Sequence, residues 1–249
     1  MKEKPAFDQC LAFINCELQP SAKLSLSPKA EARRRAVTIS RQAGCGALAV
    51  GEKLAEYLQP RSAKEAAPWA VFDRNLVEKV LEDHHLSKRL AKFMPEDRLS
   101  EMENIIEELF GLHPPTETLV RLTADTILHL AELGNVILIG RGANIITSRL
   151  DWVFHVRLVA SLERRIEHVQ QFNHLDKGAA LEFIRREDGG RERYLKKYFH
   201  EDITNPLLYH LVINTDLISY AEAAQIIGQA VMSRPANLPP NVAMTRGES

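Results

Sequence analysis

A short apolar run, two closely spaced glycines and an amphipathic segment follow one another within residues 35–58, RAVTISRQAGCGALAVGEKLAEYL. Residues 36–39 predict a β-strand, Gly44 and Gly46 predict a tight loop, and the segment behind them predicts a helix. A glycine-containing loop at a helix N-terminus presents backbone N–H groups to anionic oxygens. A purely structural turn has the same pattern, so this motif alone leaves both a nucleotide-related site and a structural turn open.

The loop departs from the complete phosphate-binding consensus, G-x-x-x-x-G-K-[ST], at three positions. Aligned on Gly46, the first glycine is replaced by Arg41, the lysine by Ala47 and the hydroxyl residue by Leu48. In the consensus, the lysine contacts the β- and γ-phosphates and the hydroxyl binds magnesium. The sequence therefore predicts the backbone cradle without these two groups, and Arg41 is a candidate for the missing charge.

Composition restricts the class of protein. With 249 residues, 45% of them hydrophobic, the chain is long enough for one enzyme-sized α/β domain with a substantial core. Lys and Arg total 32 against 33 Asp and Glu, so no global field attracts nucleic acid or an anionic membrane. The 3 cysteines lack metal-ligand spacing, and no apolar run approaches bilayer length. We therefore expect a cytoplasmic protein without a metal site of its own, a membrane segment or a nucleic-acid partner.

Both ends of the chain differ from its middle. Apolar residues recur at helical spacing within 7–18, which predicts a short amphipathic helix. Residues 19–35 are rich in Ser, Pro and basic side chains and predict a linker, so residues 1–34 are expected to form an N-terminal extension. Residues 234–249 contain several prolines and no periodicity, which predicts a disordered tail.

Between these ends, five apolar runs alternate with helical segments. This alternation is typical of an α/β fold with a doubly wound, five-stranded parallel sheet and right-handed crossovers. The expected strands are residues 36–39, 69–72, 136–139, 152–158 and 210–214. The expected helices after the first are residues 75–81, 100–112, 116–133, 162–170 and 221–232.

In such sheets, ligands bind at the carboxyl ends of the strands. Arg141 directly follows the third strand and stands between two glycines, which favours a bidentate phosphate contact over an ion pair with a local carboxylate such as Asp151. Asp73 follows the second strand, where its position is fully explained by capping the helix expected from residue 74.

An arginine-rich segment, IRREDGGRERYLKKY, covers residues 184–198. Arg185, Arg186 and Arg191 flank a break expected at Gly189-Gly190. A mobile helical hairpin of this kind is suited to closing over phosphates and neutralising their charge. The alternative is a solvated helix whose acidic residues pair with these arginines, and the balanced charges make that interpretation credible.

Five segments occur here in the order found in cytidylate-kinase-like proteins, a branch of the nucleoside monophosphate kinases with the P-loop fold. They are RQAGCG, IGRGANII, VFHVRLVASLERRIEHV, RREDGGRERYLKKY and LVINTDLISYAEAAQII. The chain resembles this family over residues 36–232. That branch often replaces the loop lysine and hydroxyl, and its pattern D-x-x-R-x-x-Y-x-x-x-Y is met by Asp188, Arg191, Tyr194 and Tyr198.

The resemblance implies a P-loop kinase-like domain over residues 35–233, with a helical acceptor-binding insert at 73–133 and a lid at 177–204. It also implies ATP and Mg²⁺ as cofactors and nucleotides as partners. The loop would bind ATP through Arg41, Gln42, Ala43, Gly44, Cys45, Gly46, Ala47 and Leu48. The acceptor would be bound by Asp73, Arg141 and Asp188, and the catalytic arginines would be Arg41, Arg185, Arg186 and Arg191.

Two functions follow as hypotheses. The first is transfer of the γ-phosphoryl group of ATP to a pyrimidine nucleoside monophosphate. The second is a catalytically weak nucleotide-binding or sensor module that kept the fold and lost the loop lysine and hydroxyl. The sequence leaves the oligomeric state and the acceptor base open.

Overall fold

The computed structural model describes residues 35–62, 67–73 and 116–234. The expected extension at 1–34, the tail beyond residue 234 and most of the acceptor-binding insert lie outside the described residues, as do the helices expected at 75–81 and 100–112.

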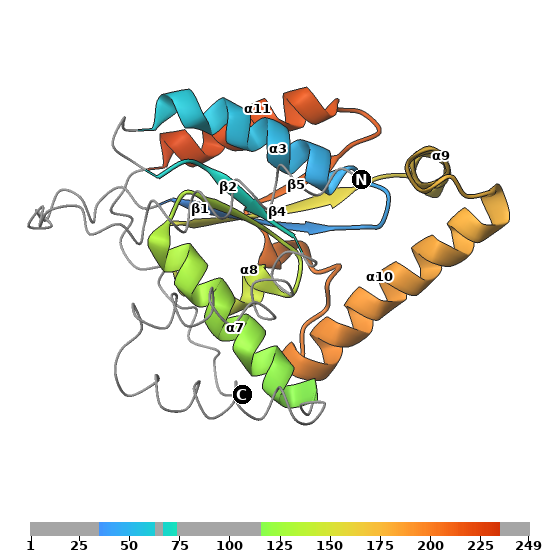
Figure 1. The fold of residues 1–249 in the computed structure, drawn as a ribbon, viewed down its shortest axis with the longest axis horizontal. Helices are drawn as coiled ribbons and strands as arrows, with labels where there is room; N and C mark the ends of the chain where they lie inside the picture. Colours follow the sequence, from blue (N-terminus) through green and yellow to red (C-terminus); the bar gives the residue numbers. More distant parts are fainter. Residues whose placement is uncertain (1–34, 63–66, 74–115, 235–249) are drawn as a thin grey trace, which may run out of the picture.

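A five-stranded, all-parallel sheet forms the centre of the molecule, as the sequence predicts (Figure 1). The strand order is β2-β3-β1-β4-β5. Because the strands are parallel, each strand is joined to the next one along the chain by a crossover connection. The central strands are buried on both faces, which is why they read as continuous apolar runs rather than alternating ones. The strands are β1 (Ala36–Arg41), β2 (Ala70–Phe72), β3 (Val136–Ile139), β4 (Val153–Val159) and β5 (Leu211–Asn214).

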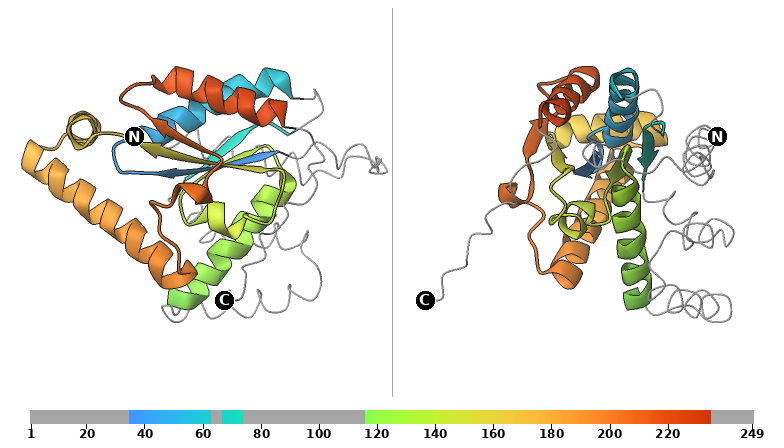
Figure 2. Two further views of the ribbon diagram at one scale, coloured as in Figure 1. Left: turned by 180° about the vertical axis from the view of Figure 1, so that it is seen from behind. Right: turned by 90° about the vertical axis from the view of Figure 1, so that its left-hand side faces the viewer.

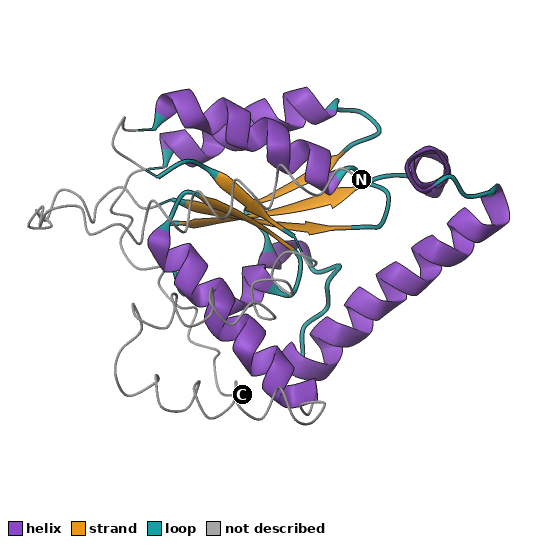
Figure 3. Ribbon diagram, in the orientation of Figure 1, coloured by secondary structure: helices purple, strands orange, loops and turns teal. Residues whose placement is uncertain are grey.

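Helices cover both faces of this sheet (Figure 3). Helices α3 and α11 pack against one face and against each other, while α7 and α8 lie on the opposite face (Figures 1 and 2). Helices α9 and α10 extend from the carboxyl edge of the sheet. The helices are α3 (Ala47–Leu58), α7 (Thr116–Leu133), α8 (Ala143–Ile146), α9 (Leu162–Asn173), α10 (Lys177–Phe199) and α11 (Tyr220–Ser233), with 3-10 turns η1 (Gln59–Arg61) and η2 (Pro206–Leu208).

The break predicted at Gly189-Gly190 is wrong, because both glycines lie inside the single 23-residue helix α10. Asp176 caps the start of this helix by accepting a hydrogen bond from the Ala179 N–H, and His200 ends it in the left-handed conformation. A glycine in a helix interior costs only about 1 kcal/mol relative to alanine. Two glycines are too few to interrupt a capped helix whose other residues are mostly strong helix formers.

Among the described helices, none combines the length and the apolar character needed to cross a membrane.

Candidate functional site

The first element of the site is the loop between β1 and α3. Gly44 and Gly46 have φ values of 85° and 71°, in the left-handed region that glycine adopts without a steric penalty. Gln42 fixes the entry of the loop, since its N–H donates to the Leu158 carbonyl at 3.1 Å and its side-chain oxygen accepts from the Ala160 N–H at 3.0 Å. The strand, glycine loop and helix predicted from the sequence are therefore present.

This loop has unused hydrogen-bond donors. Within the described part of the chain, the N–H groups of Gly44, Cys45, Gly46 and Ala47 donate to no other residue. The first N–H groups of a helix lack intrahelical acceptors, and together with the helix dipole they favour an anion. The backbone therefore retains the donors of a phosphate cradle.

The side chains that complete a phosphate loop are missing, as expected. Ala47, at the lysine position, is 8% exposed and belongs to the core between the sheet and α3 and α11. Leu48, at the hydroxyl position, is 40% exposed. Cys45 is buried, and burial raises the pKa of its thiol to about 11, so the thiol stays protonated at neutral pH.

The described residues do not build a magnesium site. No three of their His, Cys, Asp or Glu side chains are arranged to hold a metal ion. The carboxylate nearest the loop, that of Asp188, is already paired with two guanidinium groups. The described part of the chain therefore offers no set of ligands that fits a protein-bound magnesium ion.

The second element of the site is the turn after β3. Gly140, Arg141 and Gly142 are three consecutive left-handed residues, with φ values of 88°, 54° and 70°. For the non-glycine residue Arg141, this conformation costs about 1–2 kcal/mol. Strained backbone conformations of this kind cluster at functional sites. Arg141 is therefore a candidate functional residue.

Arg41, the last residue of β1, directs its side chain to this turn rather than into the loop. Its guanidinium lies against Gly140, in the space that a side chain at position 140 would occupy. The pKa of Arg41 is lowered to about 9, chiefly by burial and then by the charge of Arg191, while Asp73 and Glu187 oppose the shift. The positive charge of Arg41 is thus only partly compensated.

A cavity of about 290 Å³ opens between these strand ends and α10. Four guanidinium groups reach it from three elements, and Glu187 is the acidic residue among its lining. Gly190 lies beside the cavity, and a methyl group at that position would meet no atom within 4 Å. The four arginines are Arg41, Arg141, Arg186 and Arg191.

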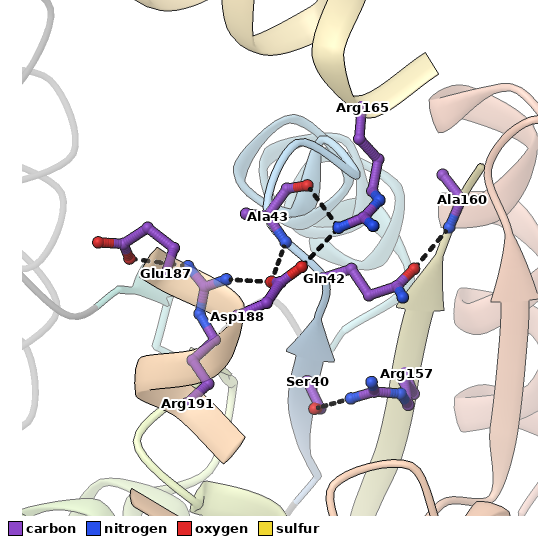
Figure 4. Close-up of polar contacts among 9 residues, drawn as sticks. All are labelled: Ser40, Gln42, Ala43, Arg157, Ala160, Arg165, Glu187, Asp188 and Arg191. Atoms are coloured by element: carbon purple, nitrogen blue, oxygen red, sulfur yellow. Dashed lines mark hydrogen bonds and ion pairs between the residues drawn. The ribbon is translucent and has the colours of Figure 1, made fainter. Parts of the chain in front are cut away.

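The loop and α10 meet at Asp188 (Figure 4). One Asp188 carboxylate oxygen accepts from the Ala43 N–H at 2.7 Å and from Nη1 of Arg191 at 3.0 Å. The other oxygen accepts from Nη1 of Arg165 at 2.5 Å. Arg191 also donates to Glu187 at 3.2 Å. The Asp188 carboxylate of helix α10 therefore holds this helix against the loop.

A second cavity, of about 370 Å³, is lined by Gly44 of the loop together with residues of α9 and of the segment that leads into α11. Tyr220, the first residue of α11, places its ring against Gly46. The His168 ring packs edge-on to the Tyr220 ring, with 6.0 Å between the two ring centroids. Asp216 accepts a hydrogen bond from the Ser161 N–H at 2.7 Å on the rim of this cavity. One cavity is thus lined by Arg41, just before the loop, and the other by Gly44, within it.

The structure brings most of the sequence-predicted residues together. The described cavity unites Arg41 and Arg141 with two of the lid arginines, and Asp73 lies near enough to influence Arg41 electrostatically. Arg185 is exposed and does not line the cavity.

Sequence reasoning missed Arg165, Asp216 and Tyr220. Asp216 follows the last strand, so the rule that ligands bind at strand ends pointed to it. Arg165 and Tyr220 lie inside helical patterns with no distinguishing signal.

Comparison with known proteins agrees with this architecture. The family model described as the cytidylate kinase-like family matches residues 36–217, well over half of the chain. No curated protein sequence matches the chain significantly.

Two solved structures were found to be similar to this chain, and the similarity of fold rests on the first of them. An uncharacterized protein from Eubacterium ventriosum ATCC 27560 is 17% identical, with a TM-score of 0.60 and coverage of 81% of this chain and 100% of that chain. Shikimate kinase from Bacteroides thetaiotaomicron is 15% identical, with a TM-score of 0.44 and coverage of 80% of this chain and 99% of the enzyme.

Proposed function

The chain belongs to the cytidylate kinase-like family, and on that premise we propose that it transfers the γ-phosphoryl group of ATP to a pyrimidine nucleoside monophosphate such as CMP. Membership of this family supports a kinase-like function. The choice of ATP as the phosphoryl donor and of CMP as the acceptor is what we propose beyond that. The observation that carries it is the convergence of four arginines on one cavity beside the glycine loop.

The charge of this cavity supports a phosphate ligand. Arg41 is held among Arg141 and Arg191, and these like charges together with burial lower its pKa. A dianionic phosphate would relieve this repulsion and accept bidentate hydrogen bonds from planar guanidinium groups. We therefore assign the acceptor monophosphate to this cavity, with Asp73 close enough to act on the charge of Arg41.

The arrangement of two cavities around one loop supports a two-substrate reaction. The base of ATP would lie near Tyr220 and His168, and its phosphates would follow the unused N–H groups of the loop toward the arginine cavity. The terminal phosphate would then face the acceptor. Such an arrangement lowers the barrier by holding the reactants in line and close together.

The chemistry needs no covalent intermediate with the protein. As the phosphoryl group passes to the acceptor, charge spreads over its equatorial oxygens, and fixed guanidinium groups stabilise that charge. Arg186 and Arg191 on α10 and Arg41 and Arg141 on the sheet edge would surround the group in transit. Helix α10, which already forms one wall of the cavity, would shield the group in transit from water and so limit hydrolysis of ATP.

A second candidate function is a nucleotide-binding or sensor module with little turnover. The observation that favours it is the absence of a charge at Ala47 and of a hydroxyl at Leu48. Loss of one positioned charge commonly costs about 3–4 kcal/mol of transition-state stabilisation.

A thermal-shift series tests the proposed ligands. CMP and ATP should each raise the melting temperature, since a ligand at 100 times its Kd adds about 2.7 kcal/mol to the free energy of unfolding. Cytidine, which lacks the phosphate, is the matched control and should produce no comparable shift. Each ligand is measured with and without magnesium. Equal shifts with CMP and cytidine, or no shift with either nucleotide, would contradict the proposal.

A further inference from the structure

Arg165 is the guanidinium that lies against the loop. It belongs to the first turn of α9, is 8% exposed, and reaches the Ala43 carbonyl with Nη1 at 3.5 Å. The backbone of Arg165 also packs against the loop: a Cβ added at Gly44 would lie only 2.7 Å from the Arg165 carbonyl oxygen. Arg41, by contrast, points to Gly140 and the arginine cavity. The positive charge nearest the loop backbone is therefore that of Arg165.

The position of Arg165 is fixed by apolar packing around it. Ala43 of the loop belongs to one buried cluster with Ile166 and Val169 of α9 and Ala180 and Ile184 of α10. Residue 166 is the next residue along the helix, so the guanidinium is held at the loop by its own neighbours. A cation fixed in this way loses little side-chain entropy when it binds an anion.

Asp188 marks a place where this loop binds negative charge. Its carboxylate receives a backbone N–H from Ala43 and one guanidinium N–H each from Arg165 and Arg191 (Figure 4). A phosphate oxygen would be bound by the same kinds of donor, namely a loop amide and fixed cations. The carboxylate thus stands where an anionic oxygen of a ligand would be stabilised.

The donors around the loop exceed what Asp188 satisfies. Nε of Arg165 is buried and has no hydrogen-bond partner among the described residues. The N–H groups of Gly44, Cys45 and Gly46 are likewise unused within that part of the chain. A buried donor without a partner costs about 1–3 kcal/mol. A phosphate chain, with more oxygens than a carboxylate, is the ligand class that would satisfy these groups together.

We propose that Arg165 is the phosphate-binding cation of the loop, in place of the lysine absent at Ala47, and that Asp188 occupies this site until a phosphate of the donor nucleotide displaces it. The inference rests on the proposed function in that the loop receives the donor phosphates. Displacement of Asp188 also releases Arg191, which already lines the arginine cavity, from one of its two carboxylate partners, leaving Glu187 as the other. Binding of the donor is thereby coupled to the supply of a lid arginine.

Calorimetric titration with ATP and with inorganic tripolyphosphate, in the absence of any acceptor, tests the role of Arg165. Arg165→Ala should weaken both ligands about 10- to 150-fold, the range expected for loss of one charged hydrogen-bonding contact. Arg165→Lys, which keeps the charge, should recover part of the affinity. Arg193→Ala removes an exposed arginine of α10 outside the cavity and should bind like the wild type. Wild-type affinity in Arg165→Ala would overturn the inference.

Asp188→Asn tests the displacement independently of whether Arg165→Ala folds. Removing the carboxylate charge leaves two cations without their anion, so tripolyphosphate should bind about tenfold more tightly. Glu192→Gln, a charge removal at an exposed position of the same helix, should leave the affinity unchanged. Unchanged or weaker binding by Asp188→Asn would contradict displacement.

These results separate the inference from the proposed function. Tight, Arg165-dependent binding of tripolyphosphate without transfer to any nucleoside monophosphate would refute the kinase and keep the inference. Transfer to CMP with full ATP affinity in Arg165→Ala would keep the kinase and refute the inference. A wild-type protein that binds neither ATP nor tripolyphosphate would refute both.

Discussion

The guanidinium of Arg41 lies directly against the α-carbon of Gly140, filling the space in which a side chain at that position would stand. Arg41 is the last residue of β1 and Gly140 directly follows the neighbouring strand β3, so the contact links the strand that leads into the glycine loop to the left-handed turn that carries Arg141. A largely buried cation is thereby placed beside two further arginines. The like charges of these arginines repel one another, and the phosphate that we propose for this cavity would offset that repulsion.

Arg41→Met should stabilise the protein without ligand and abolish its response to CMP. Methionine keeps most of the length of arginine and removes a charge that burial and nearby arginines disfavour. We expect a higher melting temperature than that of the wild type and no further rise with CMP. Differential scanning calorimetry with and without CMP measures both effects. A lower melting temperature together with a wild-type CMP response would contradict this role for Arg41.

Arg141→Gly should separate stability from binding. Glycine relieves the left-handed strain, so the free energy of unfolding should hold or rise by up to about 1 kcal/mol. CMP affinity should fall about 10- to 150-fold, while ATP affinity stays near that of the wild type. Urea unfolding and calorimetric titration provide the two values. Arg149→Gly, at an exposed position after α8, is the control. Equal CMP affinities in Arg141→Gly and the wild type would make Arg141 a structural residue.

The sheet and the strand-end residues were predictable from sequence because each depends on a local pattern. Continuous apolar runs identify buried parallel strands, and the topology then places Arg41 and Arg141 at one edge. Arg165 could not be found in this way. It reaches the loop only because α9 folds back over Ala43, a contact between residues 122 positions apart.

The Gly189-Gly190 prediction failed for a different reason. Glycine is a weak helix breaker, and capping at Asp176 together with the flanking helix formers outweighs it. Sequence patterns report such local preferences but do not show which of them tertiary packing overrides.

Gly190→Ala should therefore stabilise α10. The position is helical, and an added methyl group would meet no atom within 4 Å, so the substitution gains about 0.5–1 kcal/mol from the lower entropy of the unfolded chain. Guanidinium chloride unfolding measures the change. A loss of stability would indicate that the helix bends at this glycine in solution.

The stability of the protein should fall in mild acid because of His155. This residue is 6% exposed and lies 2.8 Å from the Thr38 hydroxyl through Nδ1. Burial, with smaller contributions from His210 and Arg234, lowers the pKa of His155 to about 3. His155 therefore binds a proton near pH 6.5 in the unfolded chain, but only near pH 3 in the folded protein. The free energy of unfolding consequently decreases as the pH falls from 6.5 towards 3.

Urea unfolding at pH 6.5 and pH 5 tests this dependence. The free energy of unfolding should drop by about 1.6 kcal/mol from this one histidine, because the slope rises from half of its full value at pH 6.5 to about 1.4 kcal/mol per pH unit near pH 5. In His155→Gln, the free energy of unfolding should decrease less between the two pH values, by the amount that His155 contributes in the wild type. An identical decrease in the wild type and in His155→Gln would assign the acid sensitivity to other groups.

Product analysis of the protein incubated with CMP, ATP and magnesium tests the central claim most directly. CDP and ADP, separated by chromatography, should form in equal amounts, with no CDP when cytidine replaces CMP. Arg191→Ala should slow their formation while CMP and ATP still bind. If ATP and CMP bind to the wild-type protein but no diphosphate forms from CMP or from any other nucleoside monophosphate, the phosphotransferase account is wrong and the protein is a nucleotide-binding module.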